Sequence, residues 1–169
     1  MVQIVTGRLT GNSLYQSISD FICSQGTYES LAMEYFASQR GCFAAILDGD
    51  AVVGTSLAFD VDGAKGIAEK ISSFLLASDI DISTCVSPAC IYLDDAYTGQ
   101  RLGDKMTVAR SQYCIDQGYE YTVLWEYDTQ AIFDYSTRVG NLIDTGMVDS
   151  KNFPIYLRRL SDVIDALKG

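Results

Sequence analysis

A strand, a glycine-containing loop, a helix and a second strand follow one another between residues 83 and 127, and this order limits the fold more than any other feature of the sequence. Residues 83–93 predict a strand, and apolar residues then recur at helical spacing through residues 102–117. That helical stripe consists of Leu102, Met106, Ala109 and Tyr113. Residues 119–127 are rich in aromatic and β-branched residues, which is typical of a buried strand. Two strands joined through a helix in this way are parallel strands of one sheet.

The rest of the chain predicts antiparallel strands and further helices around this unit. Two apolar runs flank Asp48 and Gly49, a pair typical of a tight hairpin turn. Ser13 and Gln16 have the spacing of a capping box, so we expect a helix from there to about Ser24. The other expected elements are strands at 2–9, 142–148 and 153–160, helices at 28–40, 63–76 and 128–139, and a short polar tail.

These elements define the expected fold class, a mixed and mostly antiparallel α/β sheet flanked by helices, with one parallel strand–helix–strand crossover. The chain is long enough to bury a core and contains no repeat or linker, so we expect one domain over residues 1–169. Residues 63–82 form a helical insert within it.

The loop before the helix at 102–117 combines glycines with nearby basic residues. Gly99 and Gly103 allow the backbone to approach a ligand, and N–H groups at a helix start bind anions. Arg101, Lys105 and Arg110 fall within one ten-residue stretch of a chain whose formal net charge is −10. This pattern predicts a phosphate site, and an ordinary turn with solvated charges is the alternative.

Composition excludes several kinds of chemistry. The sequence contains no histidine, which removes the usual zinc sites and the Ser-His and Cys-His nucleophile systems, and we expect no metal. The five cysteines form no CxxC pair and are expected to be free thiols, mostly buried.

Charge and hydropathy indicate the partners. The acidic balance argues against nucleic-acid binding and favours a cationic small molecule or basic peptide, although acidity also serves solubility. No apolar run is long enough to cross a membrane, and the N-terminus lacks a secretion signal. We therefore expect a cytoplasmic protein with no membrane partner.

Four segments carry a resemblance to a known family. They are Ile46–Gly54, with its Asp-Gly turn, apolar pair and glycine; Leu93–Gly99, a strand end running into a loop; Asp128–Ala131, at the start of a helix; and Tyr156–Leu160, a closing strand. In this order they resemble the GNAT superfamily, the acyl-CoA-dependent N-acetyltransferases. The resemblance implies a splayed pair of central strands and acetyl-CoA as co-substrate. It also implies an insert at 63–82, which either walls the acceptor site or serves packing.

The loop that would hold the pyrophosphate departs from the family pattern at two positions. That pattern is Arg or Gln, two free positions, Gly, one free position, then Gly or Ala. Gly103 matches, whereas Thr98 replaces the basic residue and Arg101 replaces the middle glycine. The Arg101 side chain either crowds the pyrophosphate or binds it in place of the missing basic residue. The resemblance assigns CoA binding to Leu93, Thr98, Gly99, Gln100, Arg101, Leu102, Gly103 and Asp128.

The resemblance also implies direct attack of the amine on acetyl-CoA, with a tyrosine that protonates the departing sulfur. Tyr135 matches when positions are counted forward from Ala131, and Ser136 matches when they are counted back from Gly140. We expect Tyr135 to be the acid. Glu126 is the expected general base, with Asp94 and Asp95 as rivals, and a backbone N–H near Leu93 would stabilise the oxyanion.

The expected function is therefore N-acetyl transfer to the amine of a small molecule or peptide, by a monomer or homodimer. One alternative is a non-catalytic module of the same fold that binds acyl-CoA or a protein partner. The other is an α/β interaction domain that binds no CoA.

Overall fold

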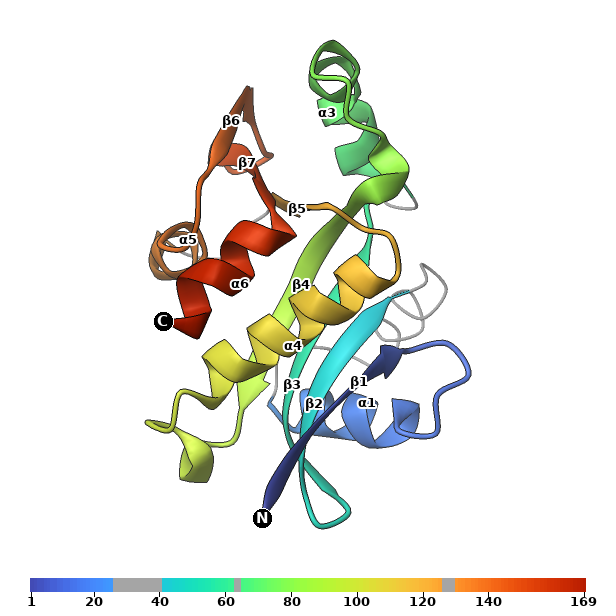
Figure 1. The fold of residues 1–169 in the computed structure, drawn as a ribbon, viewed down its shortest axis with the longest axis vertical. Helices are drawn as coiled ribbons and strands as arrows, with labels where there is room; N and C mark the ends of the chain where they lie inside the picture. The colour runs from blue at the N-terminus through green and yellow to red at the C-terminus, as the bar shows by residue number, and fades with distance from the viewer. Residues whose placement is uncertain (26–40, 63–64, 126–129) are drawn as a thin grey trace.

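The computed structural model describes residues 1–25, 41–62, 65–125 and 130–169. The helix expected at 28–40 lies outside the described residues. In the part described, one seven-stranded sheet has the order β1-β2-β3-β4-β5-β7-β6 (Figure 1). The strands are β1 (Val2–Arg8), β2 (Cys42–Asp48), β3 (Ala51–Asp60), β4 (Cys85–Leu93), β5 (Tyr121–Leu124), β6 (Ile143–Val148) and β7 (Pro154–Arg159). The helices are α1 (Tyr15–Ser24), α3 (Lys65–Ala77), α4 (Leu102–Asp116), α5 (Gln130–Thr137) and α6 (Leu160–Lys168), with short 3-10 helices η1 (Ile82–Thr84) and η2 (Asp95–Tyr97).

Strand pairing confirms the predicted fold class. Neighbouring strands pair antiparallel except β4 and β5, which are parallel and joined through α4. The predicted hairpin is also present, with Asp48 opposite Ala51. Gly49 in its turn has a φ of 61°, a left-handed conformation that glycine adopts without steric cost.

The two parallel strands separate soon after they begin. Their ladder contains two residue pairs, Cys85 with Tyr121 and Val86 with Thr122. β4 nevertheless continues to Leu93, in the direction of the loop before α4. A register shift at Leu57 and Ala58 of β3 marks a bulge in the β3–β4 ladder, and a bulge bends and twists a strand pair. The expected splay of the central strands is therefore present.

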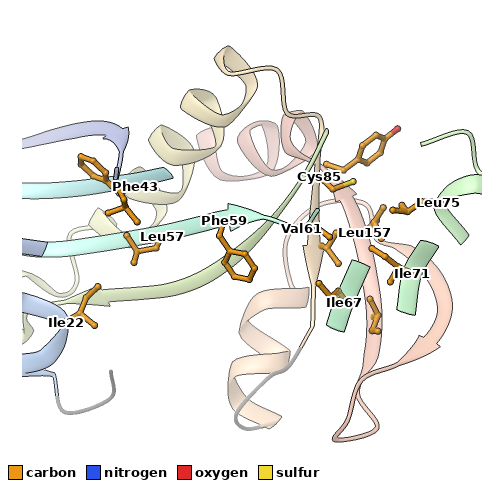
Figure 2. Packing of buried hydrophobic residues seen from close by; sticks show 14 of the residues in the cluster. Ile22, Phe43, Leu57, Phe59, Val61, Ile67, Ile71, Leu75, Cys85 and Leu157 are labelled. Carbon is orange, nitrogen blue, oxygen red and sulfur yellow. The ribbon is translucent and has the colours of Figure 1, made fainter. Parts of the chain in front are cut away.

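Alternation of side chains along the strands gives the sheet two packed faces. Figure 1 shows α4 lying across β2, β3 and β4, with α6 beside it. On the opposite face, Ile22 of α1 and Ile67 of α3 belong to one hydrophobic cluster. Figure 2 shows this cluster running from Ile22 past Phe59 to Leu157 of β7. We call this side of the sheet the α1/α3 face.

α3 is the helix expected in the 63–82 insert. Its apolar stripe, Ile67, Ile71 and Leu75, is buried in the same cluster as Leu157 (Figure 2). The stripe is therefore part of the main core of the described structure.

Two expectations about helices were wrong. The capping box at Ser13 and Gln16 does not form, because α1 begins at Tyr15 and the N–H of Leu14 donates to Asn12 Oδ1 at 2.9 Å. The chain does not finish in a polar tail, since α6 follows β7 directly. Its buried residues, Leu160, Val163 and Ile164, recur at helical spacing. The predicted apolar stripe on α4 is confirmed, because Leu102 and Met106 are buried and Ala109 and Tyr113 pack against the core clusters on this face.

Other findings bear on composition. Each of the five cysteines is a free thiol, with Cys23 exposed and Cys42, Cys85 and Cys114 buried. Among the described residues, no group of three His, Cys, Asp or Glu side chains is placed to hold a metal ion. None of the helices described has the length and apolar character needed to cross a membrane.

Candidate functional site

The loop between β4 and α4 is a tight turn fixed by its own hydrogen bonds. The N–H of Asp94 donates to Val53 O of β3 at 2.9 Å, and Asp94 Oδ1 accepts from Ala96 N at 2.9 Å. Thr98 Oγ1 then donates to Asp95 O at 2.9 Å and closes η2. The Asp94 carboxylate therefore serves the turn, which weakens its case as a rival general base.

After η2 the backbone enters α4 through two left-handed residues. Gly99 has a φ of 79° and Arg101 a φ of 56°, so Arg101 holds a conformation that suits glycine, the residue the family pattern has there. A Cβ built on Gly99 would meet nothing within 4 Å, and one on Gly103 would come no closer than 3.8 Å to Ile91 Cδ1. The glycines thus leave the backbone of the turn open to approach.

The N-terminus of α4 presents backbone donors at this turn. Its first helical hydrogen bond runs from Lys105 N to Arg101 O at 3.1 Å. The N–H groups of Leu102, Gly103 and Asp104 precede that bond, so no carbonyl of the helix accepts from them. Such donors, together with the helix dipole, favour a bound anion.

The Arg101 side chain extends from this turn to the end of α6. Its guanidinium donates to Leu167 O at 3.2 Å and to Gly169 O at 3.4 Å, and Nε lies 3.2 Å from Asp104 Oδ2. A cation placed on the last carbonyls of a helix complements its dipole. Since 60% of the side chain is exposed, the guanidinium retains a solvent-facing surface beside the turn.

The expected grouping of basic residues at the loop was wrong for Arg110. Arg110 of α4 is 7% exposed, and its guanidinium lies between α4 and β3. It donates to Ser56 Oγ at 2.6 Å and to Leu57 O at 3.2 Å. Arg138 instead reaches the turn from beyond α5, with its NH2 group 3.4 Å from Asp104 Oδ1. Sequence gave no signal for Arg138, because the contact depends on how α5 packs.

Tyr97 fastens the loop to the β2–β3 hairpin, a role that the sequence did not reveal. Its hydroxyl donates to Asp48 Oδ2 at 2.7 Å. This hydrogen bond is the main cause that lowers the pKa of Asp48 from its ordinary value of 3.8, and it raises the pKa of Tyr97. The bond therefore links the candidate anion site to the hairpin.

We predict that this link weakens in acid. The pKa of Asp48 is lower in the folded state than in the unfolded state, so its carboxylate stabilises the fold above the ordinary pKa of 3.8, and this contribution is lost as pH falls through the folded-state value. Tyr97→Phe should remove that part of the acid dependence, so the melting temperatures of the two proteins should converge as the pH falls. Melting curves between pH 3 and 7 test this, and equal pH profiles for the two proteins would contradict it.

The interval where β4 and β5 diverge carries polar and thiol side chains on the α1/α3 face. Trp125 Nε1, just beyond β5, donates to Ser87 Oγ of β4 at 2.7 Å. Cys90 and Tyr92 of β4 pack against the same cluster as Trp125. Burial raises the pKa of the Cys90 thiol to about 12, so this thiol is neutral at pH 7.

The structure brings together the predicted CoA-binding residues of β4 and the loop. Leu93 ends β4 opposite Gly54, where a Cβ would lie 2.9 Å from Leu93 Cδ1 and 3.3 Å from Tyr92 O. Glycine at position 54 thus permits the close approach of the two strands. The turn that follows contains Thr98, Gly99, Gln100, Arg101, Leu102 and Gly103, of which Leu102 is buried.

The predicted catalytic residues are described only in part. Glu126 and Asp128 lie outside the described residues. Tyr135 is on α5, where its backbone is described and its side chain is not. α5 itself is held firmly, because Phe133 stacks on Phe153 with ring centroids 5.2 Å apart and Arg158 donates to Ser136 O at 2.9 Å.

Solved structures of other proteins share this architecture. A GNAT-family acetyltransferase from Staphylococcus aureus Mu50 aligns with a TM-score of 0.60 and 16% identity, over 95% of this chain and 99% of its own. PaiA N-acetyltransferase from Thermoplasma acidophilum, solved with coenzyme A, aligns with a TM-score of 0.52 and 11% identity, over 94% and 99%. The acyl-homoserine lactone synthase LasI aligns with a TM-score of 0.64 and 10% identity, over 99% and 94%. No protein-family model matches the sequence, and a search of curated proteins found no match.

These likenesses establish the fold. The chain has the fold of the GNAT superfamily, as the sequence motifs predicted.

Proposed function

We propose that this chain is an acyl-CoA-dependent N-acyltransferase that moves an acetyl group from acetyl-CoA to the amine of a small molecule or peptide. The observation that carries the proposal is the course of β4, which leaves β5 after Val86 and leads into the turn before α4. The pantetheine arm would lie along β4, where a strand edge offers backbone hydrogen bonds. The phosphates would lie at the turn and the N-terminus of α4.

The chemistry requires no metal. The amine attacks the thioester carbonyl, the C–S bond breaks, and the CoA thiolate takes a proton. We assign that proton to Tyr135, the amine proton to Glu126, and stabilisation of the oxyanion to a backbone N–H of β4, on the Ser87 side of Leu93. The neutral thiol of Cys90 is a weak nucleophile, which favours direct attack over an acyl-cysteine intermediate.

Charge supports a cationic acceptor. The chain carries a formal net charge of −10, which draws cations toward it over a range set by the salt concentration. Structural neighbours include agmatine N-acetyltransferase, N-acetylglutamate synthase and the acyl-homoserine lactone synthase BjaI, the last solved with SAM and isopentyl-CoA. Agmatine and SAM, which are cations, are therefore the first acceptors to test, with glutamate as an anionic comparison.

The alternative proposal is a non-catalytic module that binds acyl-CoA or a protein partner. It is favoured by Arg101, which stands in a left-handed position and has its guanidinium bound to α6 and Asp104. A protein partner would leave the affinity for CoA negligible, whereas a CoA sensor would bind CoA without turnover.

Turnover separates these proposals. Acetyl-CoA and each amine are incubated with the protein, and the acetylated amine is measured by mass spectrometry, because the exposed Cys23 would react with thiol reagents. We expect product with a cationic amine at a rate well above the reaction without protein. CoA binding without product from any amine would support the non-catalytic module.

We predict that Arg101 contributes to CoA affinity. Arg101→Ala and Arg101→Gly should both weaken binding by about 1–2 kcal/mol, the range of a charge-assisted hydrogen bond. Alanine keeps a Cβ at the left-handed φ of 56°, as arginine does, so the alanine variant isolates the loss of the guanidinium, whereas glycine also relieves backbone strain. Isothermal titration with CoA measures both. Tighter binding by the glycine variant would show that the side chain obstructs the site.

A further inference from the structure

Trp125 is the one tryptophan in the sequence, and it lies where the two central strands part. The last pair in the β4–β5 ladder is Val86 with Thr122. The next residue on β4 is Ser87, whose hydroxyl accepts from the Trp125 indole at 2.7 Å. The indole therefore folds back from the end of β5 toward the closed end of the diverging pair.

The hydrogen bond fixes the orientation of this indole. Ser87 is 1% exposed and lies in β4 opposite Phe59 of β3, so its position is set by the sheet. Trp125 is only half-buried and packs against the cluster on the α1/α3 face, as do Cys90 and Tyr92 of β4. The large, flat indole is therefore partly exposed, and it is held beside β4 near the end where β4 and β5 are still paired.

The direction of β4 determines what this indole would meet. Phosphates at the turn lie beyond Leu93, so an arm that runs along β4 from there proceeds toward Ser87. The end of that arm is the thioester, and the acyl chain extends beyond it. On this path the acyl chain approaches the Trp125 ring before it reaches the paired residues Val86 and Thr122.

We propose that Trp125, oriented by Ser87, limits the length of the acyl chain that the protein accepts. This inference rests on the proposed acyl-CoA function and adds its acyl specificity. Short acyl groups fit in front of the ring, whereas chains of about six carbons collide with it. Removing the indole extends the space along the α1/α3 face, which is apolar.

The first test uses the indole as its own reporter. As the chain has one tryptophan, its fluorescence reports on this position alone. Titration with CoA should change the emission little, and acetyl-CoA or butyryl-CoA should change it clearly. Equal changes with CoA and with the acyl-CoAs would overturn the placement of the acyl group against Trp125. No binding of any of them would instead contradict the proposed function.

The second test measures acyl preference. Acetyl-, butyryl-, hexanoyl- and octanoyl-CoA are compared by affinity and by kcat/KM in wild type, Trp125→Ala and Trp125→Leu. The two variants should raise the preference for hexanoyl over acetyl by about tenfold or more, since one methylene in an apolar site already discriminates by about tenfold. The leucine variant keeps an apolar side chain, so it serves if the alanine variant folds poorly.

Two further variants distinguish this role from a structural one. Ser87→Ala frees the indole without removing it and should shift the preference in the same direction by a smaller factor. Tyr113→Ala removes an aromatic ring from the cluster on the opposite face and should leave the preference unchanged. An unchanged chain-length preference in both Trp125 variants, with CoA affinity intact, would overturn the inference.

Discussion

Replacing Arg110 by alanine is expected to lower the free energy of unfolding by about 3 kcal/mol. The guanidinium is buried beneath α4 and donates to Ser56 Oγ and Leu57 O. The β3–β4 register shifts between Leu57 and Ala58, so this carbonyl lies at the bulge in that ladder. Without Arg110, both acceptors lose a buried donor, at a cost of roughly 1–3 kcal/mol for each unsatisfied group. Thermal melting should show a drop of about 6–12 °C.

Two variants control for this effect. Lys105→Ala removes an exposed cation from the same helix and should change stability by less than about 0.5 kcal/mol. Arg110→Lys keeps the charge but loses the planar fork and should fall between wild type and alanine. A stability loss in Arg110→Ala no larger than that of Lys105→Ala would show that the two hydrogen bonds of Arg110 contribute little to stability.

Tyr135→Phe is expected to lower turnover by tenfold to a hundredfold and to leave CoA affinity nearly unchanged. The substitution keeps the ring and deletes the proposed proton donor for the thiolate. General acid catalysis contributes a factor of about a hundred or more to the rate. Because a thiolate is a good leaving group even without a proton donor, we expect an effect at the low end of this range. Steady-state rates with the best acceptor, and CoA titration of the same samples, measure the two quantities separately.

Ser136→Ala is the matched variant, because Ser136 occupies the same position when the helix is counted from Gly140. It removes only a hydroxyl, since the hydrogen bond from Arg158 is accepted by the Ser136 carbonyl. Full activity in Tyr135→Phe together with a loss in Ser136→Ala would transfer the role to Ser136. Full activity in both would leave water as the acid.

The fold could be predicted where the signals are local. The Asp48-Gly49 turn, the strand–helix–strand crossover and the helix at 63–76 depend on neighbouring residues and on hydrophobic periodicity, and the structure confirms each. The loop at 98–103 was found for the same reason, since its glycines adjoin a helix start. CoA binding, Tyr135, Glu126 and Asp128 stay predictions.

The errors and omissions arise from tertiary contacts. The sequence predicted that Arg110 belongs to the cationic loop. The structure instead buries its guanidinium against Leu57 O at the β3–β4 bulge, a contact that the spacing of residues in the sequence cannot show. The final segment was predicted to be a polar tail because charged residues alternate with its apolar ones. Leu160, Val163 and Ile164 have helical spacing, and they form the buried face of α6. The contacts of Tyr97 with Asp48 and Trp125 with Ser87 join residues distant in the chain, so no local pattern marks them.

The central claim is that CoA lies along β4 and across the N-terminus of α4. The most direct test is a titration of the protein with CoA, followed through its backbone amide resonances. We expect the largest shifts and new protection from exchange at residues 99–104 and along β4 between Cys90 and Leu93, with little change in β1 or β6. Saturating CoA at about 100 times its Kd should also add roughly 2.7 kcal/mol to stability. Shifts that are absent from 99–104, or that gather on another surface, would contradict the account.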